Sequence, residues 1–132
     1  MNDKNALDDF QHQVSQLLIR HRSVLDVISK TQEATARVNR ALTKAITECG
    51  CVEVNAHKQP YDPNKSINDH SSHLSTHLSG SLCEHCREIL TAELGKNLFY
   101  LSALCNLSQI KLSEVLKAES EKLNTLGVFN LS

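Results

Sequence analysis

Apolar and small residues recur every three or four positions through the first third of the chain, which is the spacing of one face of an α-helix. Because His21 keeps the same register, residues 6 to 49 are compatible with one long helix. Ser23, with Asp26 three residues further on, instead has the spacing of an N-terminal cap. We therefore favour a break near residues 21 to 23. The apolar stripe comprises Phe10, Val14, Leu17, Val24, Ile28, Thr31, Thr35, Val38, Leu42, Ala45 and Cys49.

The opposite face of the second helical segment is charged and is predicted to face solvent. Opposite charges four residues apart on such a face stabilise an exposed helix slightly. This face comprises Asp26, Lys30, Glu33, Arg37, Arg40 and Lys44.

The helical pattern stops at Gly50, because glycine enters the left-handed conformation that ends many helices without a side-chain penalty. Residues 51 to 65 contain both prolines and predict a loop, with a short extended piece at residues 52 to 55. Ser66 and Asp69 have the spacing of a cap for a short helix that would end at Gly80.

Two further helices are predicted in the last third of the chain. The first runs from residue 82 to about residue 107, and the second begins near residue 112 with Ser113 as its cap. The apolar tail at residues 127 to 132 is expected to dock against the rest of the chain. The apolar face of the first of these helices comprises Leu82, Cys86, Ile89, Leu90, Tyr100, Leu101, Leu104 and Leu107.

Composition agrees with a helical protein. Two prolines, four glycines and 4% aromatic residues provide few helix breakers and few strand formers. A chain of 132 residues can form one hydrophobic core. We expect an all-α protein of four or five helices in a single domain over residues 1–132, with a cysteine-flanked loop at about residues 49 to 86.

The net charge of the chain restricts the classes of binding partner that are expected. The net charge is −1, so no overall field attracts nucleic acid or an anionic membrane. The longest uncharged run, Asn97 to Ile110, is shorter than the roughly 20 residues of a spanning helix. Because the polar N-terminus does not resemble an export signal, a cytoplasmic protein is expected, with neither nucleic acid nor a membrane as partner.

Four of the five cysteines form two close pairs. Cys49 and Cys51 flank Gly50, and Cys83 and Cys86 form a CxxC motif 31 residues further on. In a chain without an export signal, such spacing indicates metal binding or redox chemistry more often than disulfides. Tetrahedral zinc commonly takes four cysteine ligands. One zinc ion would tie the two helix ends together and close the loop between them.

Other interpretations of the cysteines and histidines stay open. The close pairs are also compatible with a redox dithiol or with inert buried thiols, and His85 could replace one thiol as a ligand. Cys105 stands alone on an apolar helix and is expected in the core. The histidines that could extend a metal site, or simply be solvated, are His70, His73 and His77.

A second candidate site lies in the helix that follows the cysteines. Glu93 falls on its packing face, where a carboxylate is costly unless it is paired or bound to a metal. The segment "ELGKNLFYLSALCNLSQIKLSEVL", within residues 91–123, resembles the MazG-like all-α nucleoside triphosphate pyrophosphohydrolases, and "QEATARVNRAL" is similar to their preceding helix. The resemblance implies a Glu-x-x-Glu and a Glu-x-x-Asp that hold Mg²⁺, a nucleotide as ligand, and a homodimer.

The chain departs from that motif at two of its four carboxylates. Lys96 stands at the aspartate position, and Ala36 stands three residues after Glu33, the remaining candidate on the first helix. Metal-dependent hydrolysis of this kind needs cations that neutralise phosphate and activate water. Lys96 would pair with Glu93 in its own helix turn, or would provide a fixed positive charge for a phosphate.

These observations lead to three hypotheses about function. The first is a non-catalytic or weakly active MazG-like relative that forms a homodimer and contains structural zinc. The alternative is a Mg²⁺-dependent nucleotide pyrophosphohydrolase that uses Glu93 and Glu33. A further alternative is a zinc–thiol redox switch built from the four paired cysteines.

Overall fold

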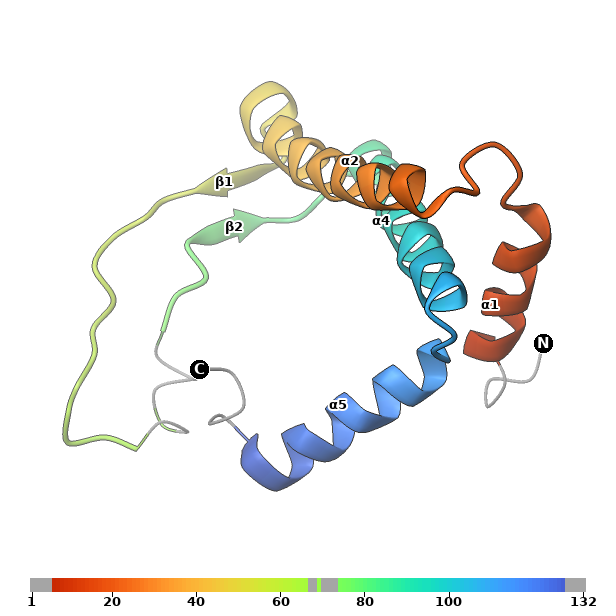
Figure 1. The fold of residues 1–132 in the computed structure, drawn as a ribbon. Coiled ribbons are helices and arrows are strands. Elements are labelled where there is room, and N and C mark those ends of the chain that lie inside the picture. Colours follow the sequence, from red (N-terminus) through yellow and green to blue (C-terminus); the bar gives the residue numbers. More distant parts are fainter. Residues whose placement is uncertain (1–5, 67–68, 70–73, 128–132) are drawn as a thin grey trace. The chain divides into compact units, whose positions relative to one another are not determined.

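A computed structural model describes residues 6–66, 69 and 74–127 of the chain, and in this part the fold is predominantly helical (Figure 1). The all-α expectation is therefore confirmed, apart from one small two-stranded sheet. Within these residues no helix combines the length and apolar character required to cross a membrane. The helices are α1 (Ala6–Leu17), α2 (Val24–Lys44), which continues as a π-helical turn (Ala45–Cys49), α4 (Glu84–Leu107) and α5 (Leu112–Leu126).

The favoured break between the first two helices is confirmed. α1 ends at Leu17 and α2 begins at Val24. The Ser23 hydroxyl accepts a hydrogen bond from the Leu25 amide at 3.3 Å, and the Ser23 carbonyl accepts one from the Val27 amide at 2.9 Å. A serine that satisfies free amides at a helix start is the role that the sequence predicted.

Contacts divide the described chain into two compact units. One contains residues 6–37 and 93–127, and the other contains the described residues of 38–92. The core of the first unit is a cluster of Val14, Leu18, Val27 and Ala103. The partly buried residues that pack against this cluster are Phe10, Phe99, Tyr100 and Leu104.

The predicted buried face of α2 is wrong by about one helix position at the start of the helix, whereas Ala45, further along the predicted stripe, is buried. Val27 and Ala34 are buried, whereas Val24 and Ile28 are almost half exposed. One position corresponds to a rotation of about 100°. The stripe that begins at Val27 also recurs at intervals of three and four, so the spacing alone did not distinguish the two registers.

The predicted face of α4 is also partly wrong. Its buried residues are Ser102, Ala103 and Cys105, whereas Leu101 and Leu107 are each more than 40% exposed. Because this helix carries apolar residues on every side, its sequence does not indicate which side packs.

The turn between α4 and α5 is held by a side chain from α1. The buried Gln11 amide donates to the Ile110 carbonyl and accepts from the Leu112 amide, both at 2.8 Å. Gln11 therefore supplies the cap that the sequence assigned to Ser113. That prediction is wrong, because α5 begins one residue earlier and the Ser113 hydroxyl donates instead to Asp8 at 2.8 Å.

The second unit contains the small sheet. The predicted extended piece is confirmed as β1 (Val52–Val54), which pairs antiparallel with β2 (Leu78–Gly80) and places Val52 opposite Gly80. β2 overturns the end of the helix predicted from Ser66 to Gly80. His77 and Gly80 both have positive φ, 59° and 87°, which is incompatible with a continuing right-handed helix.

The beginning of that predicted helix is only partly described. The Ser66 hydroxyl contacts the Asp69 carboxylate at 2.8 Å and accepts from the Asp69 amide at 3.3 Å, as a capping pair would. His70, His73 and the tail at residues 128 to 132 lie outside the described residues.

Candidate functional site

The four paired cysteines are positioned by two helix ends and the sheet. Cys49 is the last residue of the π-helical turn, and Gly50, with φ of 78°, ends it by donating its amide to the Ala45 carbonyl at 2.8 Å. Cys51 follows directly, ahead of β1. Cys83 immediately precedes α4 and Cys86 lies in its first turn. Because Val52 pairs with Gly80, the β1–β2 ladder brings the two cysteine pairs to the same end of the sheet.

The sulfur atoms of these cysteines gather closely enough to bind one ion. All four Sγ atoms lie within 4.8 Å of one another, and those of Cys49 and Cys83 are 3.8 Å apart. A tetrahedral site with Zn–S bonds of about 2.3 Å has S···S edges of about 3.8 Å. All five cysteines of the chain are free thiols in this structure. The donor set and its dimensions therefore fit a four-thiolate metal site.

The hydrogen bonds within this group favour thiolate at Cys83. Its sulfur accepts the Cys86 amide at 3.4 Å, and this bond, with a further one from the Cys86 thiol, lowers the pKa of Cys83 to about 7. The hydrogen bond with Cys83, together with desolvation, raises the pKa of Cys86 to about 12. Four thiolates cannot accumulate at this distance without a cation, because each disfavours the next. A metal ion would displace the remaining protons.

Among the described residues, the other candidates for this site do not belong to the four-cysteine group. His85 is exposed and does not belong to the four-cysteine group. His77 instead packs edge-on against His57, with ring centroids 4.6 Å apart. Cys105 is buried, which confirms its prediction as a core residue.

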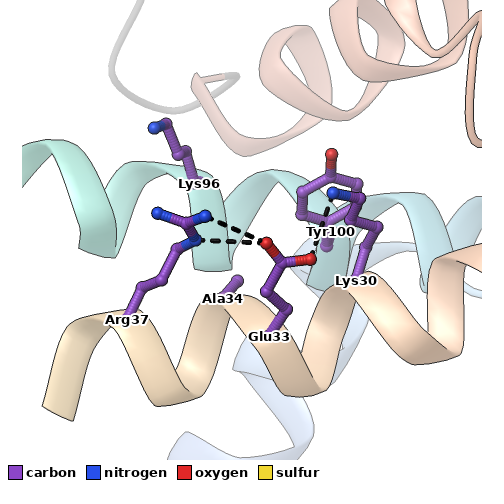
Figure 2. A pocket seen from close by; sticks show the side chains of 6 residues that line it. All are labelled: Lys30, Glu33, Ala34, Arg37, Lys96 and Tyr100. Atoms are coloured by element: carbon purple, nitrogen blue, oxygen red, sulfur yellow. Dashed lines mark hydrogen bonds and ion pairs between the residues drawn. The ribbon is translucent and has the colours of Figure 1, made fainter. Parts of the chain in front are cut away.

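Glu33 lies in a separate, positively charged pocket within the first unit. Its carboxylate forms ion pairs of 3.1 Å with both Lys30 and Arg37, which lie on the same helix (Figure 2). These two hydrogen-bonded cations lower the pKa of Glu33. The pocket has a volume of about 240 Å³ and is lined by Lys30, Glu33, Ala34, Arg37, Lys96 and Tyr100.

Glu93 and Lys96 are neighbours on α4, three residues apart. The Lys96 ammonium is 4.0 Å from one Glu93 carboxylate oxygen, the pairing that the sequence predicted, although this distance is too long for a hydrogen bond. The other oxygen, Oε2, is buried with no hydrogen-bond partner among the described residues. Over residues 6–66, 69 and 74–127, the four cysteines alone form a group of three or more potential ligands around one point. The carboxylates expected to hold Mg²⁺ do not gather in this way.

Sequence reasoning missed the contribution of Lys30, Arg37 and Tyr100 to this pocket. The two cations were assigned to a solvated face, and Arg37 is indeed 56% exposed. Both nevertheless line the pocket beside Ala34, which is only 3% exposed. That alanine, flanked by cations one helix turn away on each side, is the signal that could have indicated a pocket at the border of the buried face.

No protein-family model, curated protein or solved structure matches the chain. The MazG-like resemblance therefore stays a prediction.

Proposed function

We propose that this protein is a non-catalytic helical binding module whose cysteine-flanked loop is folded around one structural zinc ion. The observation that carries the proposal is the convergence of four Sγ atoms within 4.8 Å from two segments 31 residues apart. Structural zinc sites are closed by four protein ligands, whereas catalytic ones keep a position for water. A complete set of four thiolates accordingly favours a structural role.

The small core of the second unit supports this role. Among its described residues, the buried apolar side chains are Ala45 and Val52. Small units with so little apolar burial usually need a metal or disulfides for stability. Zinc would join the end of the α2 extension, the start of α4 and the sheet between them.

Elemental analysis of the purified protein, combined with thermal melting before and after chelation, tests this proposal. We expect about one zinc per chain, and a large loss of ordered structure at residues 38–92 when zinc is removed. Readdition of zinc should restore the structure. A melting curve that chelation leaves unchanged would exclude the structural role.

Self-association is the second part of the proposal, with another copy of this chain as the partner. Leu94, Leu98 and Leu101 on α4 are each at least 40% exposed and recur at intervals of four and three residues. Such a stripe of exposed leucines is suited to helix–helix packing. A two-fold homodimer would bury the same stripe on both subunits.

The oligomeric state can be measured by sedimentation equilibrium on the zinc-loaded protein. Leu98→Glu should yield monomer, because it places a charge in the interface. Leu17→Glu is the matched control, since Leu17 is exposed but lies outside the stripe, and it should remain dimeric. A monomeric wild-type protein would contradict this part of the proposal.

A Mg²⁺-dependent nucleotide pyrophosphohydrolase is a second candidate, favoured by one observation. The buried, unpartnered oxygen of Glu93 is the kind of group that a cation would satisfy. If Glu93 binds Mg²⁺, the ion should raise the melting temperature of the wild type but not of Glu93→Gln. A panel of nucleoside triphosphates would then be assayed for pyrophosphate release, and complete inactivity would exclude the enzyme.

A zinc–thiol redox switch is a further candidate, favoured by the exposed thiol of Cys49 lying 3.8 Å from Cys83. Peroxide would oxidise these two thiols to a disulfide, release zinc, and be reduced to water. Reversible zinc release under mild peroxide is the expected result. Zinc retention under the same conditions would exclude the switch.

A further inference from the structure

The pocket between α2 and α4 in the first unit has more positive charge than its own carboxylate neutralises. Lys30, Arg37 and Lys96 line it together with a single acidic side chain, Glu33 (Figure 2). Glu33 is held ionised by its contacts to Lys30 and Arg37. Two positive charges are therefore left over among the lining residues.

Lys96 keeps its capacity to bind a ligand. The Lys96 side chain is 62% exposed. Among the described residues, its only ion pair is the 4.0 Å approach to Glu93, and Glu93 does not line the pocket. An ammonium group has three donors, and at this distance none is committed to a hydrogen bond with that carboxylate.

We propose that this pocket binds a phosphate-type oxyanion, either free or as the end group of a small phosphorylated molecule, and that Glu33 occupies its cations when the ligand is absent. A phosphate carries more negative charge and more acceptor oxygens than one carboxylate, so it can engage Lys96 as well as Arg37. The planar guanidinium suits phosphate recognition, and lysine adds a point charge.

The size of the pocket limits the ligand. A volume of about 240 Å³ is below the roughly 300 to 1,000 Å³ of sites that enclose a drug-sized molecule. The pocket can therefore enclose a phosphate group and a small attached portion, but it would not enclose a whole nucleotide. This inference is independent of the zinc site, which lies in the other unit.

Calorimetric titration of the full, zinc-loaded chain with inorganic phosphate at low ionic strength tests the inference. Saturable binding is expected, with acetate binding more weakly because it has one charge and two oxygens. Glycerol phosphate identifies the source of the anion. Tighter binding than inorganic phosphate assigns an end group, and equal or weaker binding assigns the free anion.

Three variants make the test specific. Lys96→Gln and Arg37→Gln should each weaken phosphate binding by about tenfold, because each removes a charge-assisted hydrogen bond. Lys117→Gln is the matched control, because Lys117 is an exposed lysine on α5 outside the pocket. This substitution should change the affinity for phosphate by less than about twofold. Glu33→Gln should tighten binding severalfold, because it removes the competing carboxylate.

Several results would overturn the inference. These are the absence of saturable phosphate binding, equal losses in Lys96→Gln and Lys117→Gln, or weaker binding in Glu33→Gln. Zinc content measured on the same samples separates these outcomes from a failure of the zinc proposal, because neither site contributes a ligand to the other.

Discussion

The cysteine group and the cationic pocket each bring side chains of one kind together, but the two sites differ in what compensates their charge. The four sulfurs come from two segments far apart in the sequence and have no positively charged partner within their group. Two of the three cations of the pocket, Lys30 and Arg37, instead contact a carboxylate on their own helix, three residues after Lys30 and four before Arg37. The first arrangement needs an external ion, whereas the second is neutralised in part by its own residue.

This difference predicts that a bound ligand affects folding at one site but not at the other. An ion that joins distant segments contributes to folding, because the site does not exist in the unfolded chain. A pocket built largely on one helix persists without its ligand, and exposed ion pairs such as those of Glu33 contribute little to stability. Zinc should therefore change the fold of the second unit, while an anion should leave the fold of the first unit unchanged.

The largest expected effect is the loss of one cysteine ligand. Cys86→Ser should reduce bound zinc to well below one per chain and lower the melting temperature of the second unit by roughly 10 °C or more. Cys105→Ala is the matched control, because Cys105 is buried in the other unit. It should retain zinc and lose only the packing of one small side chain. Full zinc content in Cys86→Ser would contradict the four-cysteine site.

A second prediction concerns how the first unit is held without metal. Gln11→Ala removes the side chain that pairs with both Ile110 and Leu112. Leaving these backbone groups unpaired should cost about 2 to 4 kcal/mol in free energy of unfolding. Urea denaturation, with and without zinc, should give the same loss, because the ion does not act on this turn. Gln13→Ala, an exposed change on the same helix, should remain within about 0.5 kcal/mol of wild type.

The third prediction tests whether the sheet positions the cysteines. At Gly80, φ is positive and an added Cβ would lie 2.6 Å from the Cys51 carbonyl oxygen. Gly80→Ala should therefore cost about 2 kcal/mol or more and weaken zinc binding, because the clash is with backbone that carries a ligand. Gly50→Ala has open space around its Cβ, so it should show only the left-handed penalty of about 1 to 2 kcal/mol. Equal zinc affinities in the two variants would show that the strands do not position Cys51.

What the sequence predicted correctly depended on local signals. The break before α2, the end of the following turn at Gly50 and the four-cysteine group all follow from caps, glycine and ligand spacing. Each of these features is decided within a few residues, or by a chemistry that few other residue types share.

What the sequence did not predict depended on partners distant in the chain. β2 forms because β1 is available to pair with it, and the cap of α5 comes from Gln11, about a hundred residues earlier. The buried register of α2 is selected by side chains such as Phe99 and Tyr100 that pack against the Val27 cluster. The periodicity of the α2 sequence gives no information about these packing partners, so it was compatible with both buried registers.

The smallest expected effect is on stability in the pocket itself. Glu33→Gln removes two ion pairs at 3.1 Å, but the carboxylate is 43% exposed and solvent screens both contacts. The melting temperature at neutral pH should therefore remain close to that of wild type. Because its cations lower the pKa of Glu33, whatever stability it adds is present above its unfolded-state pKa and is lost as pH falls through the folded-state value. A large drop in melting temperature would mean that the Glu33 ion pairs hold the first unit together, and that the pocket resembles the cysteine site in its effect on folding.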